Sequence, residues 1–240
     1  MLRQIYLATS KMLTNLRWEE VIEDNLSGLN VPGYRGKLVS IGVSEEHAPI
    51  RVEGGKTTSL GSSITFNVAI DSLTINQTQG ALRNTGYYSH LAIVGDGYFA
   101  VRRPSGAVAY TRNGEFVPSP NGTLTLADGS VLLDVRGRPV RLRPDYTVRS
   151  DGSVFDRTGN LVTRIGTYRL TGIRDLGGGF YAGAAAPSAS AVMQGYLEKA
   201  NVDVIKQMTS MLMALRSFQA ASKVVSMSDE TVGKLINTLS

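Results

Sequence analysis

The chain has 240 residues, of which 42% are hydrophobic and 19% charged, so it can bury one large core or two small ones. It has no cysteine, which excludes disulfides and zinc–thiolate sites, and its net charge of +5 comes from arginines dispersed along the chain, which disfavours nucleic-acid binding. No run approaches the ~18 apolar residues of a membrane span, and acidic residues from Glu19 to Asp24 interrupt the N-terminal segment, so no cleavable secretory signal is expected.

Residues 1–34 are predicted to form an amphipathic helix that ends in a firm stop. Asn15 and Glu19 interrupt an otherwise apolar heptad seam, and Gly28 and Pro32–Gly33 end the pattern. The seam is too long for a minor cap and needs a partner surface. Its apolar members are Ile5, Ala8, Met12, Ile22, Leu26 and Leu29.

The middle of the chain has the two-residue period of β-strands. Residues 35–90 are predicted to be an extended or β connector, and residues 91–176 a β domain of short antiparallel strands. Asn–Gly and Asp–Gly pairs at Asn113, Asn121 and Asp128 are strong hairpin signals, at a spacing typical of a sandwich or barrel. Residues 177–194, rich in Gly, Ala and Ser, are predicted to be a linker.

Residues 195–240 are predicted to form a second long helix with an a/d pattern over about five heptads. Asn201 is the expected N-cap, with Asp203 in the first turn. Two interpretations remain open: a single helix packed on its own domain, or terminal helices that pair and stack with those of other copies. One seam holds Val204, Met211, Phe218, Val225, Val232 and Leu239, and the other holds Met208, Leu215, Ser222, Asp229 and Ile236.

The resulting fold class is α+β, with long N- and C-terminal helices pairing as a coiled-coil-like bundle around an all-β middle domain. No catalytic, cofactor or metal site is predicted. His47 and His90 are the only histidines and lack metal-ligand spacing, and Gly95-Asp96-Gly97 lacks the Lys and following helix of a phosphate loop. The sequence therefore does not indicate an enzyme.

Three motifs resemble those of the bacterial flagellar rod and hook protein family. "EDNLSGLNVPGYRG" is similar to the family's N-terminal signature, Asn-Leu-Ala-Asn-x-Asn-Thr-Pro-Gly-Tyr/Phe-Lys. "LAIVGDGYFAV" with "AYTRNGEF" is similar to its central pattern, and "GYLEKANVDVIKQ" to the start of its C-terminal helix. The matching residues include Asn25, Leu26, Asn30, Pro32, Gly33 and Tyr34, then Gly95, Gly97, Phe99, Tyr110, Thr111, Arg112 and Gly114, then Gly195, Leu197, Glu198 and Asn201.

The chain also departs from the family pattern at several positions. Ser27, Gly28 and Val31 differ from the N-terminal signature, His90 stands where an Asp is usual, and Leu215 replaces a usual Gln. These departures leave the family assignment intact and the subtype open.

The resemblance implies a structural, motility-related subunit of the flagellar basal body in the cell envelope, exported by the flagellar type III system without a cleavable signal. It implies terminal helices in a coiled-coil-like inner tube and a β domain outside. Implied partners are other copies, other rod and hook subunits and the export apparatus, with no nucleic acid, membrane span or cofactor. Chain length favours a rod protein over a hook protein, and the length of the segment from Gly36 to Leu91 favours a proximal rod member over a distal one.

Under this interpretation the assembly interface comprises Ile5, Met12, Ile22, Leu26, Val204, Met208, Met211, Leu215, Phe218, Val225, Val232, Ile236 and Leu239. Alternatives within the family are a distal rod or hook-type axial protein. Alternatives from other classes are a β-sandwich binding module, whose helices only dimerise it, and a peptidoglycan-acting protein.

Overall fold

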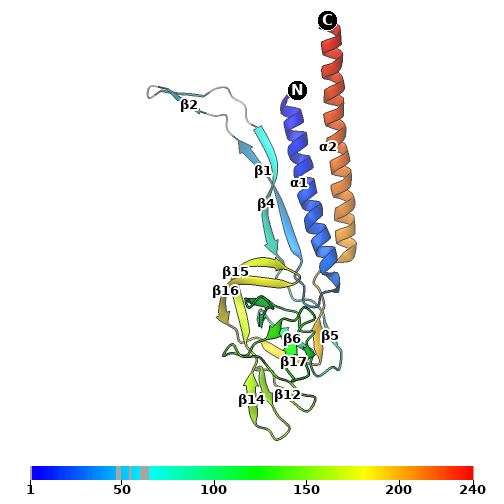
Figure 1. Ribbon diagram of the computed structural model, residues 1–240. Coiled ribbons are helices and arrows are strands. Elements are labelled where there is room, and N and C mark those ends of the chain that lie inside the picture. Colours follow the sequence, from blue (N-terminus) through cyan, green and yellow to red (C-terminus); the bar gives the residue numbers. More distant parts are fainter. Residues whose placement is uncertain (1, 47–49, 54–55, 60–64, 240) are drawn as a thin grey trace. The chain divides into compact units, whose positions relative to one another are not determined.

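The computed structural model describes residues 2–46, 50–53, 56–59 and 65–239. The chain divides into two compact units (Figure 1). Unit 1 contains Met1–Asn25, Lys37–Thr74 and Asp203–Ser240, and unit 2 contains Leu26–Gly36 and Ile75–Val202. The two long helices and the mostly antiparallel strands between them confirm the predicted combination of terminal helices and a β middle.

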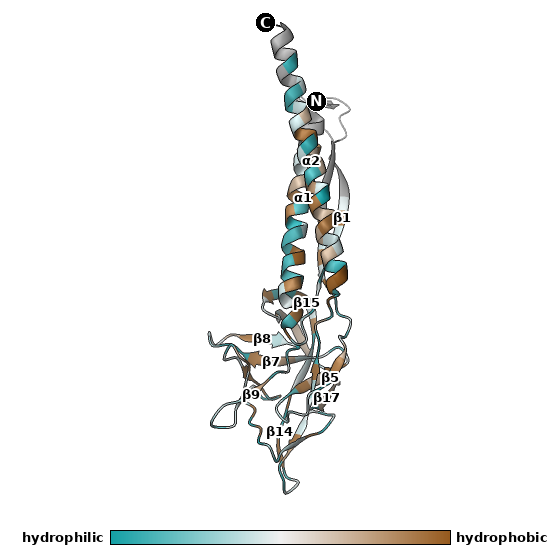
Figure 2. Cartoon of the chain, turned by 90° about the vertical axis from the view of Figure 1, so that its right-hand side faces the viewer, coloured by the Kyte–Doolittle hydropathy of each residue, from teal (hydrophilic) through white to brown (hydrophobic). Residues whose placement is uncertain are grey.

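Unit 1 is built on helices α1 (Leu2–Ser27) and α2 (Val204–Leu239). They run side by side in Figure 1 and in the perpendicular view of Figure 2, and the Asn25 side-chain amide donates a hydrogen bond to Gln207 Oε1 at 3.3 Å. Among the α2 side chains that the structure describes, the buried ones are small and seven positions apart, namely Ala214, Ala221 and Ser228. Small side chains let a helix pack closely against its neighbour, so this stripe forms the inner face of α2 within the unit.

The start of α2 differs from the predicted N-cap at Asn201. Asp203 caps the helix instead, because its Oδ1 accepts hydrogen bonds from the backbone N–H groups of Ile205 at 3.0 Å and Lys206 at 3.2 Å. These N–H groups have no intrahelical partner, and a carboxylate also suits the positive end of the helix dipole. Asn201 lies in unit 2 and serves another purpose described below.

The remainder of unit 1 is β-structure in the predicted connector region. Strands β1 (Lys37–Glu46) and β4 (Thr65–Ile75) form one two-stranded sheet, and β2 (Ile50–Glu53) pairs antiparallel with β3 (Lys56–Ser59).

Unit 2 contains a seven-stranded sheet in the order β15-β16-β8-β7-β11-β10-β9 and a three-stranded sheet in the order β12-β13-β14. Two further antiparallel pairs, β17 with β6 and β18 with β5, join residues near the end of the chain to the start of the β region. The strand bounds are β5 Leu82–Asn84, β6 Leu91–Val94, β7 Tyr98–Arg102, β8 Val108–Thr111, β9 Val117–Pro118, β10 Leu124–Thr125, β11 Val131–Leu132, β12 Thr147–Val148, β13 Ser153–Phe155, β14 Leu161–Arg164, β15 Thr167–Gly177, β16 Phe180–Pro187, β17 Ala191–Gln194 and β18 Tyr196–Glu198.

Unit 2 contains a large hydrophobic cluster and a smaller one of Tyr98, Leu170 and Tyr181. In the large cluster two aromatic rings meet. Phe99 and Phe116 are fully buried and meet edge to face, with ring centroids 5.6 Å apart. Inward-facing aliphatic residues from the strands around them complete the cluster, including Leu91, Ile93, Val101, Leu124, Leu132, Val140, Val154 and Val192.

The structure places strands in residues 177–194, where a linker was predicted. Strand β16 pairs with both β15 and β8, and Phe180 and Tyr181 are buried, so this segment belongs to the main sheet. The residues of β16 after Tyr181 are half-buried or exposed and need no large side chains, so they can be Gly and Ala. This composition is also typical of flexible linkers, which explains the wrong prediction. Backbone pairing, rather than composition, orders it.

Among the residues that the structure describes, neither helix combines the length and the apolar content that crossing a membrane would require.

Gly114 generates a testable prediction about the core. A Cβ atom at this position would lie 1.5 Å from the Leu91 carbonyl oxygen, which belongs to the backbone and cannot swing aside. We expect Gly114→Ala to destabilise the protein by about 3 kcal/mol, measured by urea unfolding with far-UV circular dichroism. Gly106→Ala is the control, since Gly106 has φ +85 but nothing within 4 Å, and it should cost only about 1 kcal/mol. Equal losses for both variants would contradict this packing.

Candidate functional site

The most constrained cluster in unit 2 is an ion triad of Arg35, Glu198 and Arg112. Arg35 follows the Pro32–Gly33 turn, Glu198 ends β18, and Arg112 directly follows β8. The Glu198 carboxylate lies 3.2 Å from Arg35 Nη2 and 3.1 Å from Arg112 Nη1, and all three side chains are only 1% exposed. Three distant segments of the sequence therefore meet at one buried carboxylate.

The triad has two positive charges and one negative charge, so its net charge is positive. Arg35 also donates to the Thr78 carbonyl oxygen and Arg112 to that of Gly95, whereas among the described residues neither Nε atom has a hydrogen-bond partner. Burial lowers the pKa of the Arg112 guanidinium and the nearby Arg35 lowers it further, while Glu198 opposes both effects. Within the described ranges, Glu198 is the one carboxylate that forms ion pairs with both guanidinium groups.

Two tyrosines lie beside the triad. The Tyr181 hydroxyl accepts a hydrogen bond from the Arg35 backbone N–H at 2.9 Å, and burial raises the pKa of Tyr181 well above its usual value. The Arg112 guanidinium carbon lies 5.2 Å from the centroid of the Tyr98 ring, within the range of a cation–π contact.

Asn201 joins the same cluster from the end of the β region. Its Oδ1 accepts a hydrogen bond from the Gly36 N–H at 2.7 Å, and its Nδ2 donates to the carbonyl oxygens of Asn76 and Thr78 at 2.9 and 2.7 Å. The Asn201 backbone N–H donates to the Tyr34 carbonyl at 3.1 Å. One amide side chain therefore connects the loop after α1 with two points in the β region.

The Pro32–Gly33 turn, which follows α1, requires glycine at its second position for steric reasons. Gly33 has φ +67, a conformation that favours glycine, and a Cβ atom there would lie 2.4 Å from the Arg112 carbonyl oxygen. Its N–H donates to the Glu198 carbonyl oxygen at 2.8 Å. The turn thus fits directly against the backbone on either side of the triad.

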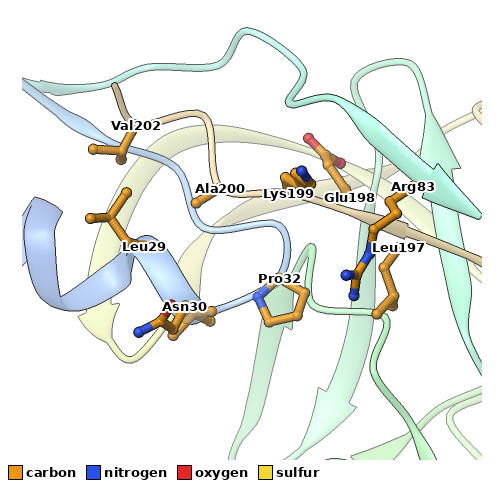
Figure 3. A pocket seen from close by; sticks show the side chains of 10 residues that line it. Leu29, Asn30, Pro32, Arg83, Leu197, Glu198, Lys199, Ala200 and Val202 are labelled. Carbon is orange, nitrogen blue, oxygen red and sulfur yellow. The ribbon is translucent and has the colours of Figure 1, made fainter. Parts of the chain in front are cut away.

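A pocket of about 410 Å³ lies beside this turn (Figure 3). Arg83 and Lys199 supply charged groups to its wall. Apolar side chains line much of the remainder, namely Leu29, Val31, Pro32, Leu197 and Val202. In the part of the chain that the structure describes, no three His, Cys, Asp or Glu side chains gather as a metal site would require, and His47 lies outside that part.

The predicted assembly residues of α2 lie mostly outside its buried stripe. Met208, Met211 and Leu215 are 56%, 39% and 46% exposed, Val204 is 38% exposed, and Phe218 and Val225 are half-buried. On α1, Ile22 is buried, while Met12 and Leu26 are half-buried. The side chains of Ile5, Val232, Ile236 and Leu239 lie outside the described residues. Helix α2 thus carries a small-residue stripe that is buried and a large apolar stripe that is largely exposed.

Comparisons with known proteins identify the family. Residues 92–156 match the model of the flagellar hook protein FlgE/F/G D1 domain, and residues 193–238 match that of the flagellar basal body rod FlgEFG protein C-terminal region. The flagellar basal-body rod protein FlgG of Bacillus subtilis is 32% identical over 99% of both chains. This chain belongs to the flagellar basal-body rod protein family. It is a structural subunit of the rod, and so part of the flagellar basal body.

Further relatives of this rod protein include proteins named FlgG, FlgF and FlhO. FlgG of Agrobacterium fabrum is 29% identical over 90% of both chains, and FlgF of Mesorhizobium japonicum is 28% identical over 98% of this chain and 97% of its own. The similarity to these proteins extends over most of the chain. It also agrees with the resemblance that the three sequence motifs indicated.

Several family-motif residues hold backbone segments together. Asn25 Oδ1 accepts a hydrogen bond from the Lys37 N–H at 2.7 Å, and its Nδ2 donates to the Lys37 carbonyl at 2.9 Å, so this side chain brackets the turn. Arg112 and Glu198 were recognised as family residues, but their pairing was not predicted. Arg35 was missed altogether. The one feature of the sequence that could have drawn attention to Arg35 is its charge, but the turn in which it lies was already predicted from Pro32 and Gly33.

The triad generates a prediction about charge. We expect Glu198→Gln to destabilise the protein by about 3 kcal/mol or more, because it leaves two buried guanidinium groups without a counter-charge. The matched control is Glu115→Gln, since Glu115 is exposed. Urea unfolding of both variants at neutral pH provides the measurement.

A triple variant tests whether the loss of stability comes from the unbalanced charge or from the changed shape of the side chains. Replacing all three triad residues together by Met or Leu should recover much of the lost stability, since apolar residues of similar volume often replace buried ion groups without loss. A triple variant as unstable as Glu198→Gln would show that shape, not charge balance, sets the cost.

His90 generates a prediction about pH. Burial lowers the pKa of its imidazole from 6.5, with Arg83 also lowering it and Glu115 opposing them, and Nδ1 lies 2.8 Å from Thr85 Oγ1. The unfolded chain therefore binds a proton more readily than the folded one, and this contribution to stability is lost as pH falls below about 6.5. We expect His90→Gln to flatten the change in urea midpoint between pH 7.5 and pH 5.5; an unchanged slope would contradict this.

Proposed function

We propose that this rod subunit is non-enzymatic, polymerises through its terminal helices and transmits torque toward the hook. The observation that supports this proposal is the exposed apolar stripe of α2, with Met208, Met211 and Leu215 as its best-described members. Soluble monomers seldom expose a contiguous apolar stripe of this kind without an interaction that covers it. Packing within the unit already uses a different stripe, so this one remains available to neighbouring subunits.

The energetic basis of polymerisation is repeated burial of that stripe. Each square ångström of apolar surface removed from water contributes ~25 cal/mol. A heterologous contact, in which two different surfaces of identical subunits meet, can repeat without closing and so builds a tube. Coiled-coil-like packing of α1 and α2 with the helices of neighbouring subunits belongs to this proposal.

The proposal extends to the route by which the subunit reaches the rod. The chain is exported by the flagellar type III apparatus without a cleavable signal, and its partners in the cell envelope are copies of itself and other axial subunits. A position in the proximal rather than the distal rod stays a prediction. It rests on the length of the segment between the first two family motifs.

Assembly through the exposed stripe is tested by adding one carboxylate to it. Leu215→Asp and Phe218→Asp should each abolish polymer formation, measured by sedimentation and electron microscopy, because a charge on the stripe cannot be buried between subunits without a large cost. Circular dichroism should show the β-structure unchanged.

Thr209→Asp is the matched control for this prediction. Thr209 is exposed on the same helix, lies off the predicted seams, and gains the same charge. It should polymerise like the parent protein. Polymerisation of both seam variants would show that the stripe is not an assembly surface.

A further inference from the structure

A groove at the edge of the three-stranded sheet stands apart from the helices and from the triad. It has a volume of about 400 Å³ and lies between strand β14 and the turn at residues 134–141. Its lining residues are Asp134, Arg138, Pro139, Arg141, Val162 and Thr163. The triad does not use any of them.

Strand β14 is the last strand of its sheet, so one of its edges faces this groove. In the described residues, the turn covers that edge only at its end, where the Val135 N–H donates to the Arg164 carbonyl at 3.1 Å and Asp134 pairs with Ile165. The register with β13 runs from Thr163 to Leu161 and skips Val162, which is therefore a bulge residue. An edge strand with unused backbone groups is a template for another strand, and the shortness and bulge of β14 restrict this edge to a short segment.

One wall of the groove carries two arginines and one aspartate, so its net charge is positive. Asp134 Oδ2 accepts hydrogen bonds from Arg138 Nε and Nη2 at 3.1 and 3.0 Å and from the Thr163 hydroxyl at 3.1 Å, so Arg138 is held in place. Arg141 is exposed, and alternates with buried Val140 and Leu142. Arginine presents a planar set of donors that matches a carboxylate.

Apolar surface accompanies these guanidinium groups. Val135, Leu161 and Val162 are 50%, 61% and 42% exposed around the same edge. A surface that combines arginines with aliphatic side chains is typical of a protein interface, whereas a simple polyanion makes no use of the aliphatic part. The chemistry therefore favours a protein segment that carries both carboxylates and apolar residues.

A second β unit of this chain fits the groove poorly. Lys and Arg outnumber Asp and Glu in unit 2. Several of its aspartates are bonded within their own turns: Asp128 to Ser130, Asp151 to Ser153, and Asp156 to Thr158 and Asn160. A copy would bring like charge to the arginines, which disfavours that contact.

We propose that this groove binds an extended acidic segment of another protein, which adds to the free edge of β14. Backbone hydrogen bonds to β14 supply affinity, and the contacts that alternate side chains of the segment make supply specificity. Carboxylates on one face meet Arg138 and Arg141, while the neighbouring aliphatic residues pack against Val162 and Leu161. The proposal concerns unit 2 alone and does not depend on how the terminal helices assemble.

The test uses the full chain and a fluorescein-labelled nonapeptide of alternating Glu and Val, with binding followed by fluorescence anisotropy. We expect binding that weakens with added salt. Arg141→Glu and Val162→Asp should each weaken it about tenfold, because each removes one of the two kinds of contact and adds a repelling charge. Arg174→Glu is the matched control. It makes the same charge change at an exposed position on β15 and should bind like the parent protein.

Further probes decide between occupants. The same peptide with alternate backbone nitrogens methylated keeps its charge but loses donors, so it should bind at least about tenfold more weakly. Equal binding of the methylated peptide or of polyphosphate would overturn strand addition in favour of a general polyanion surface. Failure of the Glu–Val peptide to bind, or self-association that Arg141→Glu abolishes, would overturn the proposal as well. Arg141→Glu should still polymerise, which separates this result from the assembly proposal.

Discussion

The structure of unit 2 depends on one buried carboxylate placed between two buried guanidinium groups. Glu198 is the counter-charge for both Arg35 and Arg112, and none of the three is exposed enough for water to take its place. Since an unpaired ion in such a site costs several kcal/mol, the three segments that carry these residues must come together or not at all. Ordinary apolar packing tolerates partial arrangements, but this ion triad does not. The triad therefore fixes the relative positions of the loop that carries Arg35, the end of β8 and β18.

The close backbone approaches around the triad follow from that constraint. Gly33 fits against the Arg112 carbonyl, and Gly114 fits against that of Leu91, in each case at a distance that admits no Cβ atom. Asn201 then bonds to the loop and to the β region with one side chain. The motif residues shared with other rod and hook proteins thus cluster where chain segments touch. This explains why the resemblance was carried by Gly, Asn, Pro and charged residues rather than by core positions.

The sequence predicted the terminal helices, the β middle and the family because these features depend on local periodicity and on short motifs. Arg35 and its pairing with Glu198 depend on contacts between distant segments, which no periodicity encodes. The β16 strand was mistaken for a linker because half-buried positions next to a paired strand can be Gly and Ala without loss of order. On α2 the heptad pattern marked the large apolar side chains, but packing within the unit uses Ala214, Ala221 and Ser228. Closely packed helices need small residues at their contact, and a heptad pattern defined by large apolar residues does not include them.

The position of Glu198 along the chain has a consequence for the order of folding. Arg112 and Glu198 are 86 positions apart, and Glu198 lies in the last fifth of the 240 residues. When a chain emerges from a ribosome or a narrow channel with its N-terminus first, both arginines are released long before their counter-ion. They remain hydrated, and the strands around them stay open, because closing early would strand two charges in an apolar interior. We therefore expect the β unit to be completed only after almost the whole polypeptide has been released.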